Sequence, residues 1–457
     1  MKDIPPITPE RDSILNLGKV LLVAYLLVGV SLLFWGALRA DTLLARDDNP
    51  RVLEAEQRIQ RGSIVDSNEI PLAFNEGPPD DQQRRYPLPA GGHLVGYYSI
   101  LHGTNSTEAG FDFDLRGESG QFWSDWVRRT LHLPQIGRDV KLALDYAIQE
   151  TAVEALGDNN GGALLLELPR DGQDRAQISA LASQPRYDAN QLDDTFEELS
   201  TAVDAPLLHR VTQGQYQPGL LVQPIILASS VDQGIIRLSD IVENPDLPVH
   251  VNGSELRCAG QPPDPATWAD VLTHRCPAPM LELADRIGLA GLDVAFAGFG
   301  LARDPVLEID TETTPDQPLE DPLLAGIGQE NLSVTPLQIG LAMSALATNG
   351  SLPQAQIGAA VRDEAGEWEP WILDEPITQA TGPAAAREVR RVLPEHNGVV
   401  EFSPVVLSGP DGSTNAWYGG MLAGDDADYV AVVVLENNAS EAEALAAGRA
   451  LLVQVQP

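Results

Sequence analysis

The chain has 457 residues, which is too long for one ordinary domain and predicts about two or three. Its hydrophobic content of 43% and charged content of 21% are typical of a chain that folds around a sizeable core, so disorder throughout is excluded. The formal net charge of −37 repels phosphate backbones, so we expect no nucleic-acid partner. Only two Cys and seven His are present, which argues against a disulfide scaffold and most zinc modules.

The first long apolar segment is 20–38, which contains no charged side chain. As a helix it spans about 28 Å, close to the bilayer hydrocarbon thickness of about 30 Å. Tyr25 and Trp35 lie toward its two ends, as interfacial aromatic residues do. We expect a single-pass membrane anchor after a cytoplasmic tail at 1–19, with the bulk of the chain outside the cytoplasm. A secretory signal peptide is the alternative, but its apolar run is usually shorter.

Beyond the anchor we expect a stalk and small pedestal module over 39–135 and a larger domain over 136–457. Alternating and helical hydrophobic patterns predict the elements of the larger domain. The expected strands are 139–145, 162–168, 178–183 and 429–435, and the expected helices are 146–156, 222–234, 278–290, 334–349, 383–393 and 440–455. A strand pair, a mostly helical insertion and a closing strand and helix predict an α/β (α+β) fold with a central antiparallel sheet.

Several short motifs follow one another along the chain. They read Arg61-Gly-Ser-Ile-Val-Asp66, Leu181-Ala-Ser-Gln-Pro-Arg-Tyr-Asp188, Gly326-Ile-Gly-Gln-Glu-Asn331, Val334-Thr-Pro-Leu-Gln338 and Ala416-Trp-Tyr-Gly-Gly420. In this order they resemble the class B penicillin-binding proteins, the D,D-transpeptidases of peptidoglycan synthesis. The resemblance implies a membrane anchor, a pedestal and a transpeptidase domain of the serine β-lactamase type.

The resemblance also implies a chemistry, which is acyl transfer through a serine. A Ser-x-x-Lys motif places the nucleophile and an amine one helical turn apart. A Ser-x-Asn motif supplies hydrogen-bonding groups, and a Lys-Thr-Gly motif on a facing strand binds the substrate carboxylate. No cofactor and no metal are expected.

The first motif falls on Leu220-Leu-Val-Gln223, because Tyr216, Pro218 and Pro224 around it match the family pattern. Leucine has no nucleophilic atom at the serine position. Glutamine at the lysine position is neutral and is no base near pH 7. This segment therefore predicts a site without a nucleophile or its activating amine.

The other two motifs are equally altered. Ser-x-Asn falls on Arg275-Cys-Pro277, so both of its polar groups are replaced. The best fit of Lys-Thr-Gly is Pro410-Asp-Gly412, with a shortened connection to the next motif, and only the glycine is kept. The carboxylate of Asp411 would repel a substrate carboxylate.

Four further residues are assigned roles from the sequence. Cys258 and Cys276 flank a polar, Pro-rich stretch and are expected to form a disulfide in an oxidising compartment. Trp417 and Tyr418 are candidates for the groove, although packing in the core and the groove wall is a more ordinary role for such residues than ligand stacking.

These losses predict a catalytically inactive transpeptidase-like domain that acts as a scaffold or regulator of the elongation or division machinery. Its expected partners are other membrane-bound cell-wall proteins, with peptidoglycan peptides as a second class of ligand. The alternative is an active or β-lactam-binding transpeptidase with a relocated nucleophile. Ser229 and Ser230 on the same helix, or Cys276 near His274, are the candidates, but no lysine follows Lys141.

Overall fold

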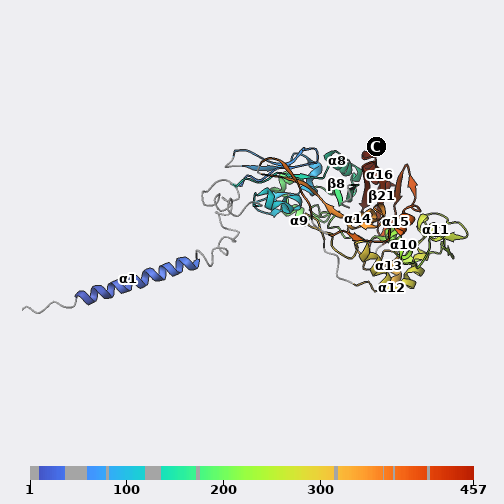
Figure 1. Ribbon diagram of the computed structural model, residues 1–457, viewed down its shortest axis with the longest axis horizontal. Helices are drawn as coiled ribbons and strands as arrows, with labels where there is room; N and C mark the ends of the chain where they lie inside the picture. Colours follow the sequence, from blue (N-terminus) through green and yellow to red (C-terminus); the bar gives the residue numbers. More distant parts are fainter. Residues whose placement is uncertain are drawn as a thin grey trace, which may run out of the picture. The chain divides into compact units, whose positions relative to one another are not determined.

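The structure is a computed structural model that describes residues 10–35, 59–78, 82–118, 135–170, 175–312, 318–363, 365–373, 376–408 and 412–456 (Figure 1). Helix α1 (Glu10–Leu33) belongs to one compact unit, and Gln60–Pro78 with Gln82–Pro457 form a second. The stretch Ile14–Leu32 of α1 is long and apolar enough to cross a membrane, by length and composition. This stretch begins before the expected residue 20, and Lys19 is the single charged residue within it.

A six-stranded sheet, ordered β16-β15-β6-β1-β2-β3, forms the first layer of the second unit. Its strands are β1 (Ile64–Val65), β2 (Pro71–Glu76), β3 (Gln83–Arg85), β6 (Val140–Leu142), β15 (Gly358–Arg362) and β16 (Trp368–Pro370). Strands β1 and β6 are parallel, and β15 returns from far along the chain to pair with β6. The sheet therefore draws strands from both sides of the boundary predicted at residue 135.

Short elements and a buried ion cluster complete this region. The elements are η2 (Pro89–Gly91), α4 (Gly92–Val95), β4 (Tyr98–Ser99), β5 (Gly103–Thr104), α5 (Ser106–Gly110) and α6 (Asp112–Leu115). The fully buried carboxylate of Glu108 accepts hydrogen bonds from Arg61 Nε at 2.7 Å and Arg84 Nε at 2.6 Å. Such a pair of guanidinium partners offsets the cost of burying the carboxylate and fixes α5 against the sheet.

The second sheet has eight strands in the order β14-β8-β7-β22-β21-β19-β18, with β20 also paired to β21. Its strands are β7 (Gly161–Pro169), β8 (Arg175–Gln184), β14 (Gln354–Gln356), β18 (Glu395–His396), β19 (Val399–Phe402), β20 (Val405–Leu407), β21 (Thr414–Ala423) and β22 (Ala427–Leu435). All neighbouring strands are antiparallel except β14 and β8. The mixed α/β fold expected from the sequence is confirmed, with one parallel edge strand added.

Helices cover both faces of this sheet (Figure 1). Helices α8 (Tyr146–Leu156) and α16 (Glu441–Gln454) pack on one face, and α14 (Pro336–Ala347) packs on the other. Alternate residues of β7 face the two layers: Leu164 and Leu166 join the α14 side, whereas Ala163 and Leu165 join the α8 and α16 side. Side chains on both faces are thus buried, which explains the continuous apolar run of this strand.

The remaining helices lie between β8 and β18 in the sequence. They are α9 (Leu192–Thr201), η4 (Gly219–Val222), α10 (Gln223–Asp232), α11 (Trp268–Thr273), α12 (Ala278–Gly298), α13 (Pro322–Gly326) and α15 (Pro383–Arg390). Short strands β9 (Ile241–Val242), β10 (Val249–Val251), β11 (Ser254–Leu256), β12 (Ala266–Thr267), β13 (Ser351–Leu352) and β17 (Thr378–Gln379) form two-stranded pairs around them. The expected helical insertion is therefore present. Gly288 (φ 63°) interrupts α12, close to residue 290, where the sequence predicted that this helix would end.

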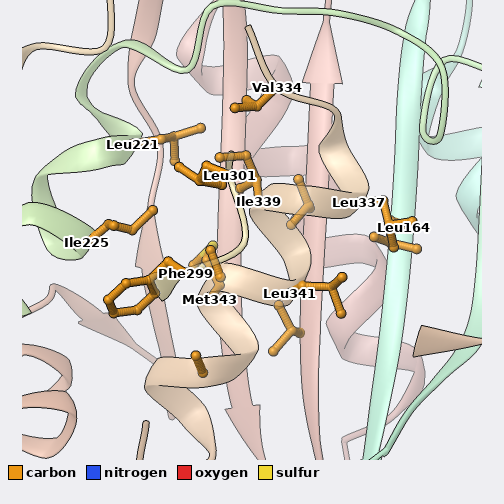
Figure 2. Packing of buried hydrophobic residues seen from close by; sticks show 14 of the residues in the cluster. Leu164, Leu221, Ile225, Phe299, Leu301, Val334, Leu337, Ile339, Leu341 and Met343 are labelled. Carbon is orange, nitrogen blue, oxygen red and sulfur yellow. The ribbon is translucent and has the colours of Figure 1, made fainter. Parts of the chain in front are cut away.

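One hydrophobic cluster joins η4 and α10 to the sheet. Figure 2 shows Leu221 and Ile225 in the same buried cluster as Phe299, Leu301 and the side chains of α14. Helix α14 begins at a capping box, in which Thr335 Oγ1 accepts from the amide of Gln338 at 3.2 Å. This packing fixes η4 and the start of α10, which together contain the predicted first motif at 220–223.

Candidate functional site

The first motif position lies in the tight turn of η4, which packs against strand β20. Gly219 has a φ of 51°, and a Cβ added there would lie 2.5 Å from both Cγ atoms of Val406. Only glycine fits this turn, because both the backbone conformation and the close strand exclude a side chain. Leu220 follows it, half-buried, and packs against the main core cluster. The position that the sequence predicts for the nucleophile therefore has an apolar side chain.

Gln223 ties the first motif position to the second. Its side chain is fully buried at the first position of α10, and Nε2 donates to the carbonyl oxygen of Cys276 at 2.8 Å. Its Oε1 has no hydrogen-bond partner among the described residues. The amide thus serves as a neutral connector between two segments, and it provides no amine that takes up a proton.

Arg275 ties the second motif position to the sheet. It has a φ of 49°, in the left-handed region that non-glycine residues rarely occupy. Its Nη1 donates to the carbonyl oxygen of Ser403, and its Nη2 pairs with Glu441 Oε1 at 2.8 Å. The guanidinium also lies 6.0 Å from the centroid of the Phe402 ring. Pro277 ends the motif as the N-cap of α12 and has no hydrogen-bonding side chain.

The cysteines meet beside these contacts. The Sγ atoms of Cys258 and Cys276 are 2.07 Å apart and form a disulfide. The amide of Ala259 donates to the carbonyl of His274 at 2.8 Å and continues the same contact. Cys276 therefore has no free thiol that His274 would activate as a nucleophile.

The predicted third motif lies mostly outside the described residues. Pro410 and Asp411 lie outside the described residues, and Gly412 is exposed, with a φ of 81°. The strand that contacts Gly219 is β20, and the carbonyl that meets Arg275 belongs to Ser403, just before β20. The segment that faces the other two motif positions is thus 401–407, upstream of the predicted place.

The two aromatic candidates lie on opposite faces of β21, and both are fully buried. Trp417 packs edge to face on Tyr216, with ring centroids 5.8 Å apart. Tyr418 faces α16, where a Cβ added at Gly448 would lie 1.9 Å from its ring. Successive residues of a strand point to opposite sides, so the two side chains belong to different layers of the core. Both residues are core packing.

Tyr216 and Arg210, near the turn, both bind the carboxylate of Glu436. The hydroxyl of Tyr216 donates to Glu436 Oε1 at 2.7 Å, and Arg210 Nε donates to the same oxygen at 2.8 Å. Burial, followed by the nearby carboxylate of Glu436, raises the pKa of Tyr216. The phenol therefore stays protonated near neutral pH and takes no part in proton transfer.

The relocated candidates are buried, and the last lysine of the chain is engaged elsewhere. Ser229 and Ser230 are buried within α10, and Ser229 Oγ accepts from Gln233 Nε2 at 2.9 Å. Lys141 lies in the six-stranded sheet, where its Nζ pairs with Glu69 at 2.7 Å. Among the described residues, no three His, Cys, Asp or Glu side chains form a group that holds a metal.

The comparisons with known proteins agree on a family. Residues 173–396 match the penicillin binding protein transpeptidase domain. The chain is 26% identical over 340 residues to the peptidoglycan D,D-transpeptidase PbpA of Mycolicibacterium smegmatis. This match covers 68% of this chain and 67% of that protein. It is also 26% identical over 331 residues to the peptidoglycan D,D-transpeptidase MrdA of Haemophilus influenzae. This second match covers 66% of this chain and 48% of that protein. The chain thus spans about half the length of the second relative.

A solved structure shares the fold. The imipenem acyl-enzyme complex of penicillin-binding protein A from M. tuberculosis superposes with a TM-score of 0.75 at 20% sequence identity. The superposition covers 88% of this chain and 99% of that chain.

Proposed function

This chain belongs to the class B penicillin-binding proteins, and from that premise we propose that its transpeptidase-like domain is catalytically inactive and serves as a scaffold or regulator of cell-wall synthesis. The observation that carries the proposal is the pair Leu220 and Gln223 at the places of the serine and the lysine. An acyl-enzyme requires a nucleophilic oxygen or sulfur and a group that accepts its proton. Neither group is present at these positions, since one side chain is a hydrocarbon and the other a buried neutral amide.

The other two motifs support the same proposal. In place of a hydroxyl and an amide, the second motif has a guanidinium engaged with Ser403 and Glu441. We assign the third motif to the run 401–407 instead of 410–412, because this run contacts both Gly219 and Arg275. The run contains no lysine, so neither placement provides an ammonium for a substrate carboxylate. When a catalytic unit is lost in this way, several orders of magnitude in rate are lost with it.

Anchoring and partners are part of the proposal. The apolar helix α1 supports attachment to the cell membrane as a single span, with residues 39–457 outside the cytoplasm. The pedestal exposes Leu101 and Phe113, at 74% and 58% of their surface, and large apolar side chains at such positions suit contact with another protein. We propose that the partners are membrane-bound proteins of the elongation or division machinery.

An active enzyme with a relocated nucleophile is the second candidate. It would use Ser229 or Ser230, which lie on the helix that follows Leu220. Both are buried, and the ammonium of Lys141 is held by Glu69 in the other sheet. The structure therefore supports this candidate less well than the inactive domain.

The test is turnover of a D-alanyl thioester donor by the purified full-length chain in detergent, with an active class B homologue as positive control. The chain and its Leu220→Ala variant should release thiol at the same rate as buffer, because no residue forms the acyl intermediate. Turnover that exceeds buffer and is abolished by Ser229→Ala or Ser230→Ala would instead establish the relocated nucleophile.

A further inference from the structure

We infer that Arg275 is a latch that holds the vestigial substrate groove shut. The latch consists of the Arg275 guanidinium, the carbonyl oxygen of Ser403 and the carboxylate of Glu441. This inference rests on the proposed loss of catalysis, and it adds how the unused groove is closed.

The latch joins segments that are distant in the sequence. Arg275 belongs to the turn before α12, Ser403 lies between β19 and β20, and Glu441 is the first residue of α16. Two further contacts close the same triangle: Gln223 bonds to the Cys276 carbonyl, and Gly219 packs on Val406. The places of all three motifs are therefore held against one another by contacts within the chain.

The latch also covers an open sheet edge. Among the described strands, β20 pairs with β21 alone, so its other side is an edge that an extended peptide would join through main-chain hydrogen bonds. The Ser403 carbonyl beside this edge already accepts from Arg275. Covering an edge with a loop from elsewhere in the chain is a known means of preventing strand addition. The arginine thus blocks peptide pairing at the place where it also replaces a catalytic hydroxyl.

The backbone at Arg275 shows that the arrangement is held in place. Its φ of 49° is unfavourable for a residue with a side chain, and such conformations persist where the surroundings over-determine them. The neighbouring residue supplies these constraints, since Cys276 is bonded to Cys258 and its amide donates to the Val271 carbonyl at 2.9 Å. The guanidinium is 18% exposed and the Glu441 carboxylate 40%, so salt and solvent reach the ion pair.

Hydrogen–deuterium exchange of the full-length chain in detergent micelles tests the latch. Arg275→Ala should raise exchange about ten-fold in peptides covering 268–276 and 399–408, since a charge-assisted hydrogen bond is worth roughly that factor. Peptides from α8 and β7 should remain unchanged. The matched control is Arg257→Ala, which removes an exposed arginine from beside the same disulfide and should leave both regions as in the wild type.

A second variant keeps the test decisive if Arg275→Ala fails to fold. In Glu441→Gln, Arg275 keeps its hydrogen bond to Ser403 and loses its ion pair. Exchange in the same two regions should therefore rise by a smaller factor. Unchanged exchange in a folded Arg275→Ala or in Glu441→Gln would overturn the latch. A penicillin adduct on the wild type, detected by intact mass in the same samples, would overturn both the proposed function and the closed groove, whereas unchanged exchange without an adduct would overturn the latch alone.

Discussion

Returning the family's lysine to the first motif should destabilise this protein instead of activating it. The change is Gln223→Lys, at a side chain that is fully buried and whose described hydrogen-bond partner is the Cys276 carbonyl. An ammonium there faces a backbone oxygen and the apolar cluster around Leu220 and Leu221. Burial of this kind lowers a lysine pKa from its ordinary value near 10.4 to roughly 7.4.

The cost follows from linkage between proton binding and folding. A folded-state pKa of roughly 7.4 costs about 4 kcal/mol at pH 7.4, because each ten-fold loss of proton affinity is worth about 1.4 kcal/mol. The folded state binds fewer protons than the unfolded state across this range, so the cost shrinks as pH rises, to about 1.5 kcal/mol at pH 9.4. The matched control is Gln233→Lys, at an exposed residue near the end of the same helix, which should cost less than about 0.5 kcal/mol.

The assay is urea unfolding of the full-length chain in detergent, followed by circular dichroism at both pH values. The reasoning is refuted if Gln223→Lys is as stable as Gln233→Lys at pH 7.4. It is also refuted if the cost fails to shrink at pH 9.4.

Two other predictions follow from the packing and the buried histidines. Gly219→Ala should cost about 2–4 kcal/mol in urea unfolding, from the positive φ and the clash with Val406, whereas Gly234→Ala, with a φ of 69° and open space, should cost only about 1 kcal/mol; equal costs would contradict the contact with β20. Burial lowers the pKa of His93 to about 4, and burial together with His93 lowers the pKa of His209 to about 3. Both bind protons less readily when folded, so stability should be full above about pH 6.5 and fall toward pH 3, at about 1 kcal/mol per pH unit for each group. His209→Asn should flatten that slope between pH 6 and 4, and an unchanged slope would contradict the assignment.

Much of the fold was predictable because the local signals agree with the tertiary structure. The helix expected at 146–156 has the observed bounds, since Asp145 caps it and accepts from the amides of Ala147 and Ile148. The strand expected at 429–435 lies within β22, and its β-branched residues are buried on both faces. Position-specific signals of this kind need no knowledge of the rest of the chain.

Long-range pairing was harder to predict. The pairing of β15 with β6 joins residues more than 200 positions apart, and nothing local in Gly358–Arg362 names its partner. The third motif is hard to place from the sequence for a related reason. Only the glycine at residue 412 survives there, so the sequence has no anchor for the register, whereas the contact between Gly219 and Val406 places the strand directly. The β-branched run at 399–407 was the available signal for this strand.

The sequence predicts places for the first two motifs because Tyr216, Pro218, Pro224 and Cys276 match the family pattern around them, and these places stay predictions. The role of Arg275 was not, since its partners Ser403 and Glu441 come from distant segments. A substitution that removes a catalytic group is readable from a motif alone. The contact that replaces the group depends on the fold.

The most direct test of the central claim is the mass of the purified full-length chain after incubation with saturating penicillin, alongside an active class B homologue. We predict an unmodified mass for this chain and a stoichiometric adduct for the homologue, because Leu220 and Gln223 provide neither nucleophile nor proton acceptor. A stoichiometric adduct on this chain would contradict the inactive assignment, and peptide mapping would then identify the residue that forms the acyl-enzyme.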